Sequence, residues 1–506
     1  MSFSINHLEE PNLTFGGGHP APDPKVGLSL YGPYSGSPTQ IPVGIIGDAG
    51  TVEQVEKLLR MFAGEIDGPT KYPLWTQSFP GLNRGSPLGC DLLLKSEWMR
   101  TLRPEDIDAL DNVAGLHSRI GQSVDLFCAE IRKLREREDS PQVFVCAPPR
   151  RMMDLCLPTH GDSRGGRGKR AAADVKPARA LIRPPGQKSL AAFFPEFKTI
   201  EDALLQRIAG DNFHHFLKAK AMAIPAPTQF VRPYTLDKFF GSQKGRVQDA
   251  ATLAWNLCVG LYYKAGGRPW KLSAIPAGTC FVGISFYKEK EIFGGGIGTS
   301  LAQVFTPEGE GLILRGDRFA WPKGREPHLS KEASKRLIER VIAAYRKQTD
   351  APPSRVVVHK SSSFDKEERA GFKDGLGSIP RHDFVTLVER SRRIKLFRAG
   401  EQPPIRGTIV SLPDDSRLLY TRGYIPLFRV YPGARVPRPL EVTFDEISTS
   451  RLDLCREILG LTRLNWNSAD FAGMQPITLQ FSREVGKILR EVPPGAAPET
   501  RYLYYM

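Results

Sequence analysis

The second half of the sequence contains apolar and amphipathic runs in a fixed order, and this order limits the possible folds more than any other feature. Three apolar runs come first: CFVGISFY from Cys280, EIFGGGIGTSLAQVF at 291–305 and GEGLILRG at 309–316. Short apolar runs bounded by turn residues predict buried strands. The glycines at 294–296 fall between strand segments, which predicts a hairpin bend.

A helix, a strand and another helix are predicted next. Ser330 is placed to cap a helix, and RVVVHK (Arg355–Lys360) predicts a strand before a charged helix that begins near Asp365. The first helix has one apolar stripe, formed by Leu337, Ile338, Val341, Ile342 and Tyr345. Three strands, a helix, a strand and a helix are the order of an RNase H-like fold. Two further amphipathic helices are expected near 452–459 and 481–489.

The first half predicts an open α/β domain over residues 1–250. IPVGIIG (Ile41–Gly47) and QVFVCAPP (Gln142–Pro149) predict strands, and Thr51 is expected to cap a helix between them. One face of that helix is apolar: Val52, Val55, Leu58, Leu59 and Phe62. The Gly- and Pro-rich first 35 residues predict an extended lead-in. No GxGxxG follows a strand, so a dinucleotide-binding fingerprint is absent.

The charge of the chain indicates a polyanionic partner. The formal net charge is +15 over 506 residues, and such an excess of Lys and Arg attracts nucleic acid, although a merely basic surface is the alternative. Residues 163–188 are basic, small and proline-bearing, a composition that predicts a surface loop. Seven scattered cysteines without a CxxC pair predict buried free thiols in a reducing cytoplasm. The start lacks the features of a secretory signal and no long apolar run is present, so we expect a cytoplasmic chain without a membrane span.

A candidate anion site lies in FHHFLKAKAMAIPAPTQF, residues 213–230. His214 and Lys218 are four residues apart and share one face of a predicted helix. Gln229 follows after a proline-rich turn. Lysine supplies charge, while histidine and an amide supply directional hydrogen bonds, so the three side chains suit a terminal phosphate. On spacing alone, a polar helix face remains the alternative.

Several segments, taken together and in order, resemble Argonaute proteins. These segments are GLSLYGPY (Gly27–Tyr34), FHHFLKAKAMAIPAPTQ, NLCVGLYYKAGGRPWKL from Asn256, CFVGISF, RVVVHKSSSF and LTRLNWNSADFAGMQPITLQFSREVGKIL (Leu461–Leu489). They span nearly the whole chain, and the lead-in is similar to that of short prokaryotic Argonautes. The resemblance implies an α/β chain with a Rossmann-like MID domain at 1–250 followed by an RNase H-like PIWI domain at 251–506.

The resemblance also implies a site for the 5′ phosphate of a guide strand. His214, Lys218, Gln229 and Lys264 stand at the family's guide-phosphate positions, although many relatives have a different residue, often tyrosine, where this chain has His214. In some members the terminal carboxylate, here that of Met506, lies near the phosphate. A Mg²⁺ ion bridging that carboxylate and the guide is left open.

The positions that carry metal-binding acids in active PIWI domains differ in this chain. The aligned residues are Ser285 and Ser361. A neutral hydroxyl does not replace a carboxylate as the main ligand for Mg²⁺. Asp365 is near the second position but is expected on the next helix, and the other two acidic positions are not placed. We therefore expect no metal in the PIWI site and no target cleavage by this chain.

The function implied by the resemblance is that of a guide-dependent sensor and not of an enzyme. It implies a small guide RNA, a single-stranded complementary DNA target, and a partner protein with an analogue-of-PAZ region and a TIR, sirtuin-like or nuclease effector domain that acts in antiplasmid or antiphage defence. Two alternatives stay open. One is a guide-directed nuclease with unrecognised acids, and the other is a guide-independent RNase H-like scaffold.

Overall fold

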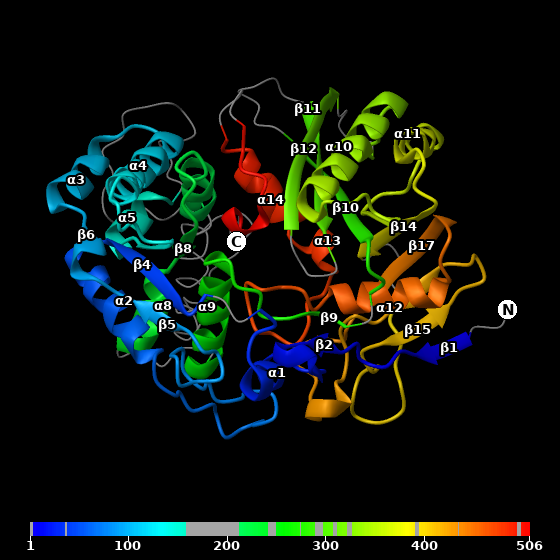
Figure 1. Cartoon of the computed structure of the whole chain (residues 1–506), viewed down its shortest axis with the longest axis horizontal. Helices are drawn as coiled ribbons and strands as arrows, with labels where there is room; N and C mark the ends of the chain where they lie inside the picture. Colours follow the sequence, from blue (N-terminus) through cyan, green and yellow to red (C-terminus); the bar gives the residue numbers. More distant parts are fainter. Residues whose placement is uncertain are drawn as a thin grey trace, which may run out of the picture.

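The computed structural model describes residues 4–35, 38–157, 212–240, 249–273, 275–288, 297–306, 311–320, 326–389, 394–433, 435–492 and 497–506. The predicted basic loop at 163–188 and the glycines at 294–296 lie outside these ranges. Two sheets form separate halves of the molecule, with the first at the left of Figure 1 and the second at the right.

The first sheet is parallel and comes from the first half of the chain. Its main path is β5 (Asp91–Leu93), β4 (Gln40–Gly47), β7 (Val143–Ala147) and β8 (Thr228–Phe230), and β6 (Met99–Thr101) also pairs with β4. The two predicted strands at 41–47 and 142–149 are confirmed. They are continuously apolar because helices cover both faces of a parallel sheet.

Helices on opposite faces of this sheet form two separate cores. One core includes residues of α2 (Ala49–Met61), α8 (Pro233–Phe240) and α9 (Ala250–Lys264). The other includes residues of α3 (Pro104–Ala109), α4 (Leu116–Arg135), α5 (Arg150–Leu155) and the helical residues 212–221. Successive residues of β7 alternate between the two cores, as the pleat of a strand requires.

Two local predictions for the first half were wrong. Asp48, and not Thr51, caps α2: its carboxylate accepts a 2.8 Å hydrogen bond from the Thr51 backbone N–H. The lead-in is not extended throughout, because α1 (Pro24–Tyr31) begins after the capping residue Asp23. Proline suits the first turn of a helix, and Gly32, at a φ of 69°, ends this one.

The second sheet has nine described strands and crosses the second half of the molecule. Its order is β1 (Ser4–His7), β15 (Thr408–Ser411), β16 (Arg417–Leu419), β17 (Leu440–Ile447), β14 (Arg381–Glu389), β13 (Arg355–Lys360), β10 (Thr279–Lys288), β11 (Ile297–Phe305) and β12 (Gly311–Ala320). β13 pairs in parallel with both β10 and β14, and the other pairs are antiparallel.

Helices cover both faces of the nine-stranded sheet. α10 (Lys331–Thr349) and α11 (Lys366–Leu376) pack on one face, and α12 (Arg451–Leu461), α13 (Ile477–Gln480) and α14 (Ser482–Leu489) pack on the other. The predicted order of three strands, helix, strand and helix is confirmed, as are the cap at Ser330 and the start of a helix near Asp365.

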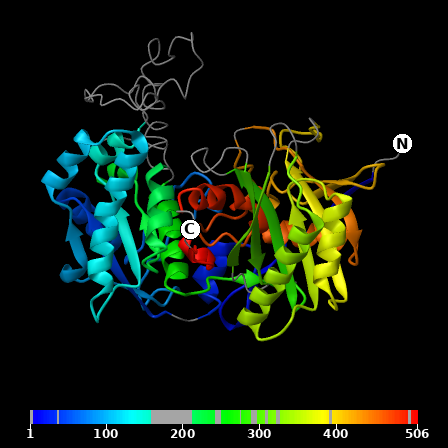
Figure 2. The same ribbon diagram turned by 90° about the horizontal axis from the view of Figure 1, so that it is seen from above.

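The lead-in joins the two halves of the molecule. Its first strand, β1, lies at the edge of the nine-stranded sheet, and β2 (Leu13–Thr14) pairs with both β3 (Pro20–Ala21) and β9 (Lys271–Leu272). Figure 2 shows the C-terminal segment between α9 and the nine-stranded sheet. All seven cysteines are buried and free, as predicted. Within the described ranges, every helix is too short or too polar to cross a membrane.

Candidate functional site

The helical residues 212–221 carry His214 and Lys218 toward β8. Phe213, on the buried side of this helix, stacks on Phe230 of β8 with ring centroids 5.5 Å apart. Lys218 is buried, and its ammonium group donates a 2.5 Å hydrogen bond to the backbone carbonyl of Thr228. The packing of one apolar residue thus fixes the helix so that the lysine head group reaches the start of β8.

Gln229 and Lys264 complete this group of side chains. Lys264 is the last residue of α9 and is also buried, and its ammonium group donates a 2.5 Å hydrogen bond to Oε1 of Gln229. Lys264 is close enough to Lys218 for its charge to lower the pKa of Lys218. The structure therefore brings together His214, Lys218, Gln229 and Lys264, hereafter the two-lysine cluster.

The electrostatics of the cluster favour a bound anion. Burial, and then the neighbouring Lys264 charge, hold the pKa of Lys218 well below its ordinary value. Burial alone lowers the pKa of Lys264 to about 7. His214 also has a lowered pKa, because of burial and then the charge of Lys218. In the described part of the chain, neither lysine forms an ion pair, so an incoming anion would supply the missing negative charge.

Three further residues belong to the surroundings of the cluster. The Thr228 hydroxyl is buried and has no hydrogen-bond partner among the described residues. Arg232 lies with its guanidinium 5.8 Å from the Phe230 ring centroid, and its charge also lowers the pKa of His214. A Cβ placed on Gly260 would be 3.8 Å from both Gln229 Oε1 and Asn467 Oδ1, so both side chains lie next to α9 at Gly260. Sequence reasoning did not find Thr228, Arg232 or Asn467.

The chain end lies near the turn that precedes β8. Met506 is buried, and the Tyr504 hydroxyl donates a 3.5 Å hydrogen bond to the carbonyl of Pro225, in the turn before β8. Within the described ranges the terminal carboxylate makes no ion pair with Lys218 or Lys264. Two ammonium groups and an amide oxygen already bonded to one of them are poor ligands for Mg²⁺. These residues fit an anion and do not by themselves fit the metal.

The helix of the cluster is also tied to the second half of the molecule. His215 lies 3.1 Å, Nε2 to Oε2, from Glu484 on α14. The hydrogen bond to His215 is the largest cause that lowers the pKa of Glu484, to about 2. α14 in turn packs on β10, where Gly486 lies against Tyr287. The helix that carries His214 and Lys218 is therefore linked to the first sheet through Lys218 and β8, and to the second sheet through His215 and α14.

Ser285 and Ser361 lie on neighbouring strands. Ile284 of β10 pairs with Lys360 of β13, so the next residues along these parallel strands are Ser285 and Ser361. Ser285 is buried and its hydroxyl has no partner in the described part of the structure, whereas Ser361 is exposed. On the same face, a Cβ on Gly283 would be 1.7 Å from the carbonyl oxygen of Thr478. Glycine therefore lets α13 pack directly beside Ser285.

One group of acids and histidine could in principle share a metal ion within the described ranges. His328, Asp365 and Glu368 have ligand atoms within 4.8 Å of one another. Asp365, which was expected on the helix, is instead the residue that caps α11. Buried Glu368 accepts hydrogen bonds from Lys360 Nζ at 2.5 Å and from the Leu329 N–H at 2.7 Å. These contacts use the carboxylate in a structural network, and Lys360 points away from the face that carries Ser285.

Comparison with known proteins identifies the fold. No known family model matches the sequence, and no curated protein matches it. Solved structures do match. Clostridium butyricum Argonaute, bound to a guide DNA and a 19-mer target DNA, aligns over 98% of this chain and 54% of that chain with a TM-score of 0.63 and 16% identity.

Two other Argonaute-type structures agree. Drosophila Piwi aligns over 99% of this chain and 56% of that chain, with a TM-score of 0.58 and 13% identity. Aquifex aeolicus Argonaute aligns over 99% of this chain and 57% of that chain, with a TM-score of 0.53 and 14% identity. This chain has an Argonaute-like fold. It spans little more than half the length of the three proteins it matches.

In this Argonaute-like fold, both candidate sites predicted from the sequence form compact groups. The two-lysine cluster joins residues from the helical segment 212–221, β8 and α9. The serine pair lies where β10 and β13 run in parallel. Both groups depend on contacts between segments that are far apart in the sequence.

Proposed function

We propose that this chain is a guide-dependent nucleic-acid sensor that binds a 5′-phosphorylated small RNA guide and recognises a complementary single-stranded DNA target. The observation that supports the proposal is the two-lysine cluster, in which Lys218 and Lys264 are buried without a carboxylate partner among the described residues. A buried charge normally has a partner. A terminal phosphate dianion would supply the negative charge and the acceptor oxygens with which both ammonium groups can pair.

In this proposal, the cluster binds the phosphate through charge-assisted hydrogen bonds. Lys218 and Lys264 donate to phosphate oxygens, and His214 and the Thr228 hydroxyl add directional bonds. Arg232 supplies further positive charge beside His214. Such bonds are shorter and stronger than those between neutral groups. The net charge of +15 supports binding of the rest of the guide and of the target through their backbones.

We further propose that target recognition activates an effector on a separate protein and that this chain does not cut its target. The similarity of the lead-in GLSLYGPY to that of short prokaryotic Argonautes supports a partner carrying an analogue-of-PAZ region and a TIR, sirtuin-like or nuclease domain. Ser285 and Ser361 support the lack of cleavage, because hydroxyls are weak ligands for the metal ions of nucleases. Antiplasmid or antiphage defence is the corresponding biological role.

Sequencing of co-purified nucleic acid tests the proposal. Protein purified from its host should carry short RNAs of narrow length range with 5′ phosphates, and a Lys218→Met/Lys264→Met variant purified in parallel should carry far fewer. Absence of short nucleic acid from the wild-type protein would support the scaffold alternative. Metal-dependent release of a discrete product from a complementary DNA strand would support the nuclease alternative.

A further inference from the structure

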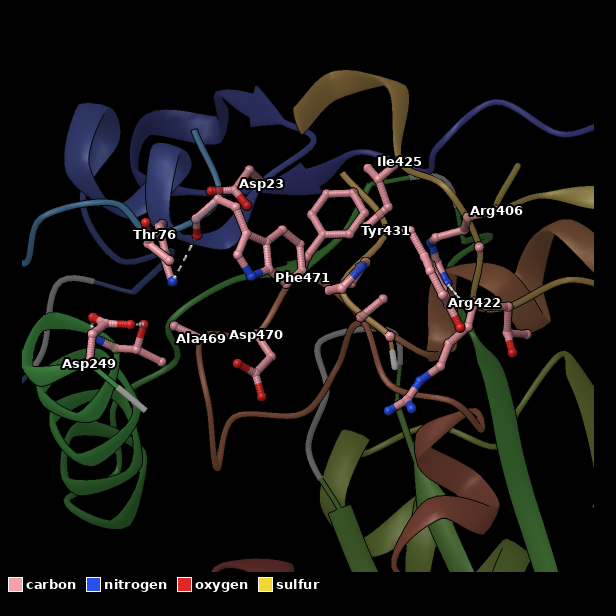
Figure 3. Close-up of a pocket in the computed structure, with 18 residues that line it drawn as sticks. Asp23, Thr76, Asp249, Arg406, Arg422, Ile425, Tyr431, Ala469, Asp470 and Phe471 are labelled. Atoms are coloured by element: carbon pink, nitrogen blue, oxygen red, sulfur yellow. Dashed lines mark hydrogen bonds between the residues drawn. The ribbon is translucent and has the colours of Figure 1, made fainter. Parts of the chain in front are cut away.

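A second candidate site lies at the other end of α9. A pocket of about 330 Å³ is formed where the start of α1, a loop at 75–76, the start of α9, and the loops at 421–433 and 469–472 meet (Figure 3). α9 has 15 residues, so at 1.5 Å per residue its two ends are roughly 20 Å apart. The pocket is therefore separate from the two-lysine cluster.

Lys25 presents unused hydrogen-bond donors in this pocket. It is only 6% exposed, and its one hydrogen bond runs to the backbone carbonyl of Trp75 at a long 3.4 Å. Burial lowers its pKa, and the charges of Asp23, Asp470 and Asp249 oppose that effect. None of these three carboxylates forms an ion pair with it within the described ranges. Two of its three N–H donors are left for a ligand that carries an acceptor.

Asp470 presents the complementary acceptor. Its side chain is exposed at the pocket and accepts no hydrogen bond within the described ranges. The other two aspartates that face Lys25 already accept hydrogen bonds, Asp23 through Oδ1 alone and Asp249 through both oxygens. Asp23 accepts from the Val26 N–H at 2.8 Å and from Gln77 at 3.1 Å, and Asp249 caps α9 with both oxygens. In the described part of the pocket, Lys25 therefore offers free N–H donors and Asp470 offers a free carboxylate.

The walls of the pocket suit a flat ring. Trp75, Tyr431 and Phe471 line it (Figure 3). Phe471 is held in place by the Arg463 guanidinium, 4.3 Å from its ring centroid, and by an edge-on contact with Phe428 at 5.0 Å. Phe471 is itself buried and packs the wall, whereas Trp75 and Tyr431 are partly exposed and offer ring surface on which a planar heterocycle can stack. The volume lies at the lower end of the usual range for small-molecule sites.

We propose that this pocket binds the guanine base of a nucleoside or nucleotide. Guanine carries a carbonyl acceptor, O6, beside N–H donors on the same edge. Lys25 donates to O6, and Asp470 accepts from the ring N–H and the amino group. Adenine has an amino group at the position of O6, which would face the Lys25 ammonium. The exposed Arg422 at the rim pairs with a phosphate when a nucleotide binds.

Titration of the guide-free full-length chain tests this proposal. Guanosine and adenosine are the first probes, because they lack the phosphate that the two-lysine cluster would attract. We expect guanosine to bind at least about tenfold more tightly than adenosine. Guanine would pair with both Lys25 and Asp470, whereas adenine would leave Lys25 without an acceptor. Lys25→Met and Asp470→Asn should each weaken guanosine by about tenfold or more. Arg422→Ala should weaken GMP and leave guanosine unchanged.

Matched controls separate this site from the proposed guide site. Lys264→Met should leave guanosine binding unchanged, and exposed Asp470→Asn should leave binding of a phosphorylated guide unchanged. No guanosine binding at millimolar concentration, equal binding of adenosine, or guanosine binding that Asp470→Asn does not alter would each overturn the proposal. Loss of guanosine binding in Lys264→Met alone would also overturn it, because the ligand would then occupy the two-lysine cluster.

Discussion

Lys264 donates a 2.5 Å hydrogen bond to the side-chain carbonyl of Gln229, whose amide nitrogen donates to the backbone carbonyl of Phe230 at 3.2 Å. Gln229 therefore uses both ends of its amide on its neighbours and holds the Lys264 ammonium in position. Contact of Gln229 with the phosphate stays a prediction from the resemblance. The two hydrogen bonds add a second role, and we propose that Gln229 also positions Lys264 within the two-lysine cluster.

Gln229→Glu tests that positioning role. A carboxylate in contact with Lys264 would neutralise its charge and repel a phosphate. We expect a 5′-phosphorylated guide to bind at least about tenfold more weakly, a factor that corresponds to about 1.4 kcal/mol. A 5′-hydroxyl guide should bind as it does to the wild type. Gln229→Met removes the hydrogen bond without adding charge and should cost less. Unchanged affinity of Gln229→Glu for the phosphorylated guide would contradict the assignment.

The pH dependence of guide binding tests the charge of the cluster. Burial lowers the pKa of Lys264 to about 7, so the protonated fraction of free Lys264 falls as the pH rises above that value. A bound phosphate favours the protonated form. The preference for a 5′-phosphorylated over a 5′-hydroxyl guide should therefore decrease from about pH 7 to pH 9, and also below about pH 6, where the phosphate gains a proton. In Lys264→Met the decrease above pH 7 should be smaller, and the remaining decrease would come from Lys218, whose pKa is also lowered by burial. A preference that rises from pH 7 to pH 9 would exclude a titrating lysine.

The buried pair of Lys360 and Glu368 tests the interpretation of the His328–Asp365–Glu368 group. Both side chains of the pair are 0% exposed, with Nζ and Oε2 2.5 Å apart. Glu368→Gln leaves the ammonium buried without its counter-charge and should lower the free energy of unfolding by about 3–5 kcal/mol. Urea denaturation measures the change. The exposed pair Lys57–Glu53 is a control, and Glu53→Gln should change stability far less, because solvent screens an exposed pair. A large stabilisation of the wild type by Zn²⁺ or Mg²⁺ would instead indicate a metal site.

Much of the fold could be predicted because its signals are local. The strands β4, β7, β10 and β13 are continuous apolar runs, and the cap at Ser330 is a single residue before an apolar stripe. The contacts that could not be predicted join distant segments. β1 pairs with β15 about 400 residues away. No local pattern encodes such a partner.

The candidate site likewise has residues that local sequence spacing predicts and residues that only contacts between distant segments bring together. His214 and Lys218 could be placed together because four residues of helix fix their relation. The resemblance to Argonautes supplied Lys264, while Arg232 and Asn467 were missed because only tertiary packing brings them near Gln229 and His214. The choice of Asp48 over Thr51 as a cap was within reach of the sequence, since both residue types cap helices and only the start of the helix decides between them.

Ser285 and Ser361 lead to a prediction about cleavage. We expect no cutting of a labelled complementary DNA by the guide-loaded wild type with Mg²⁺ or Mn²⁺. Ser285→Asp/Ser361→Asp should cut little or not at all, because metal catalysis also needs further ligands and correctly oriented neighbours. Ser285 is moreover buried beside the contact of Gly283 with α13. Guide and target binding should persist in the variant. A discrete product that depends on both guide and metal in the wild type would reverse this part of the proposal.

The most direct measurement is the affinity of the Lys218→Met/Lys264→Met variant for two guides that differ only in a 5′ phosphate or a 5′ hydroxyl. Each lysine should contribute roughly 1.5–3 kcal/mol to binding of the phosphorylated guide. We therefore predict a loss of at least about a hundredfold for that guide and little change for the hydroxyl guide. An equal loss for both guides would show that the two-lysine cluster does not bind the guide phosphate.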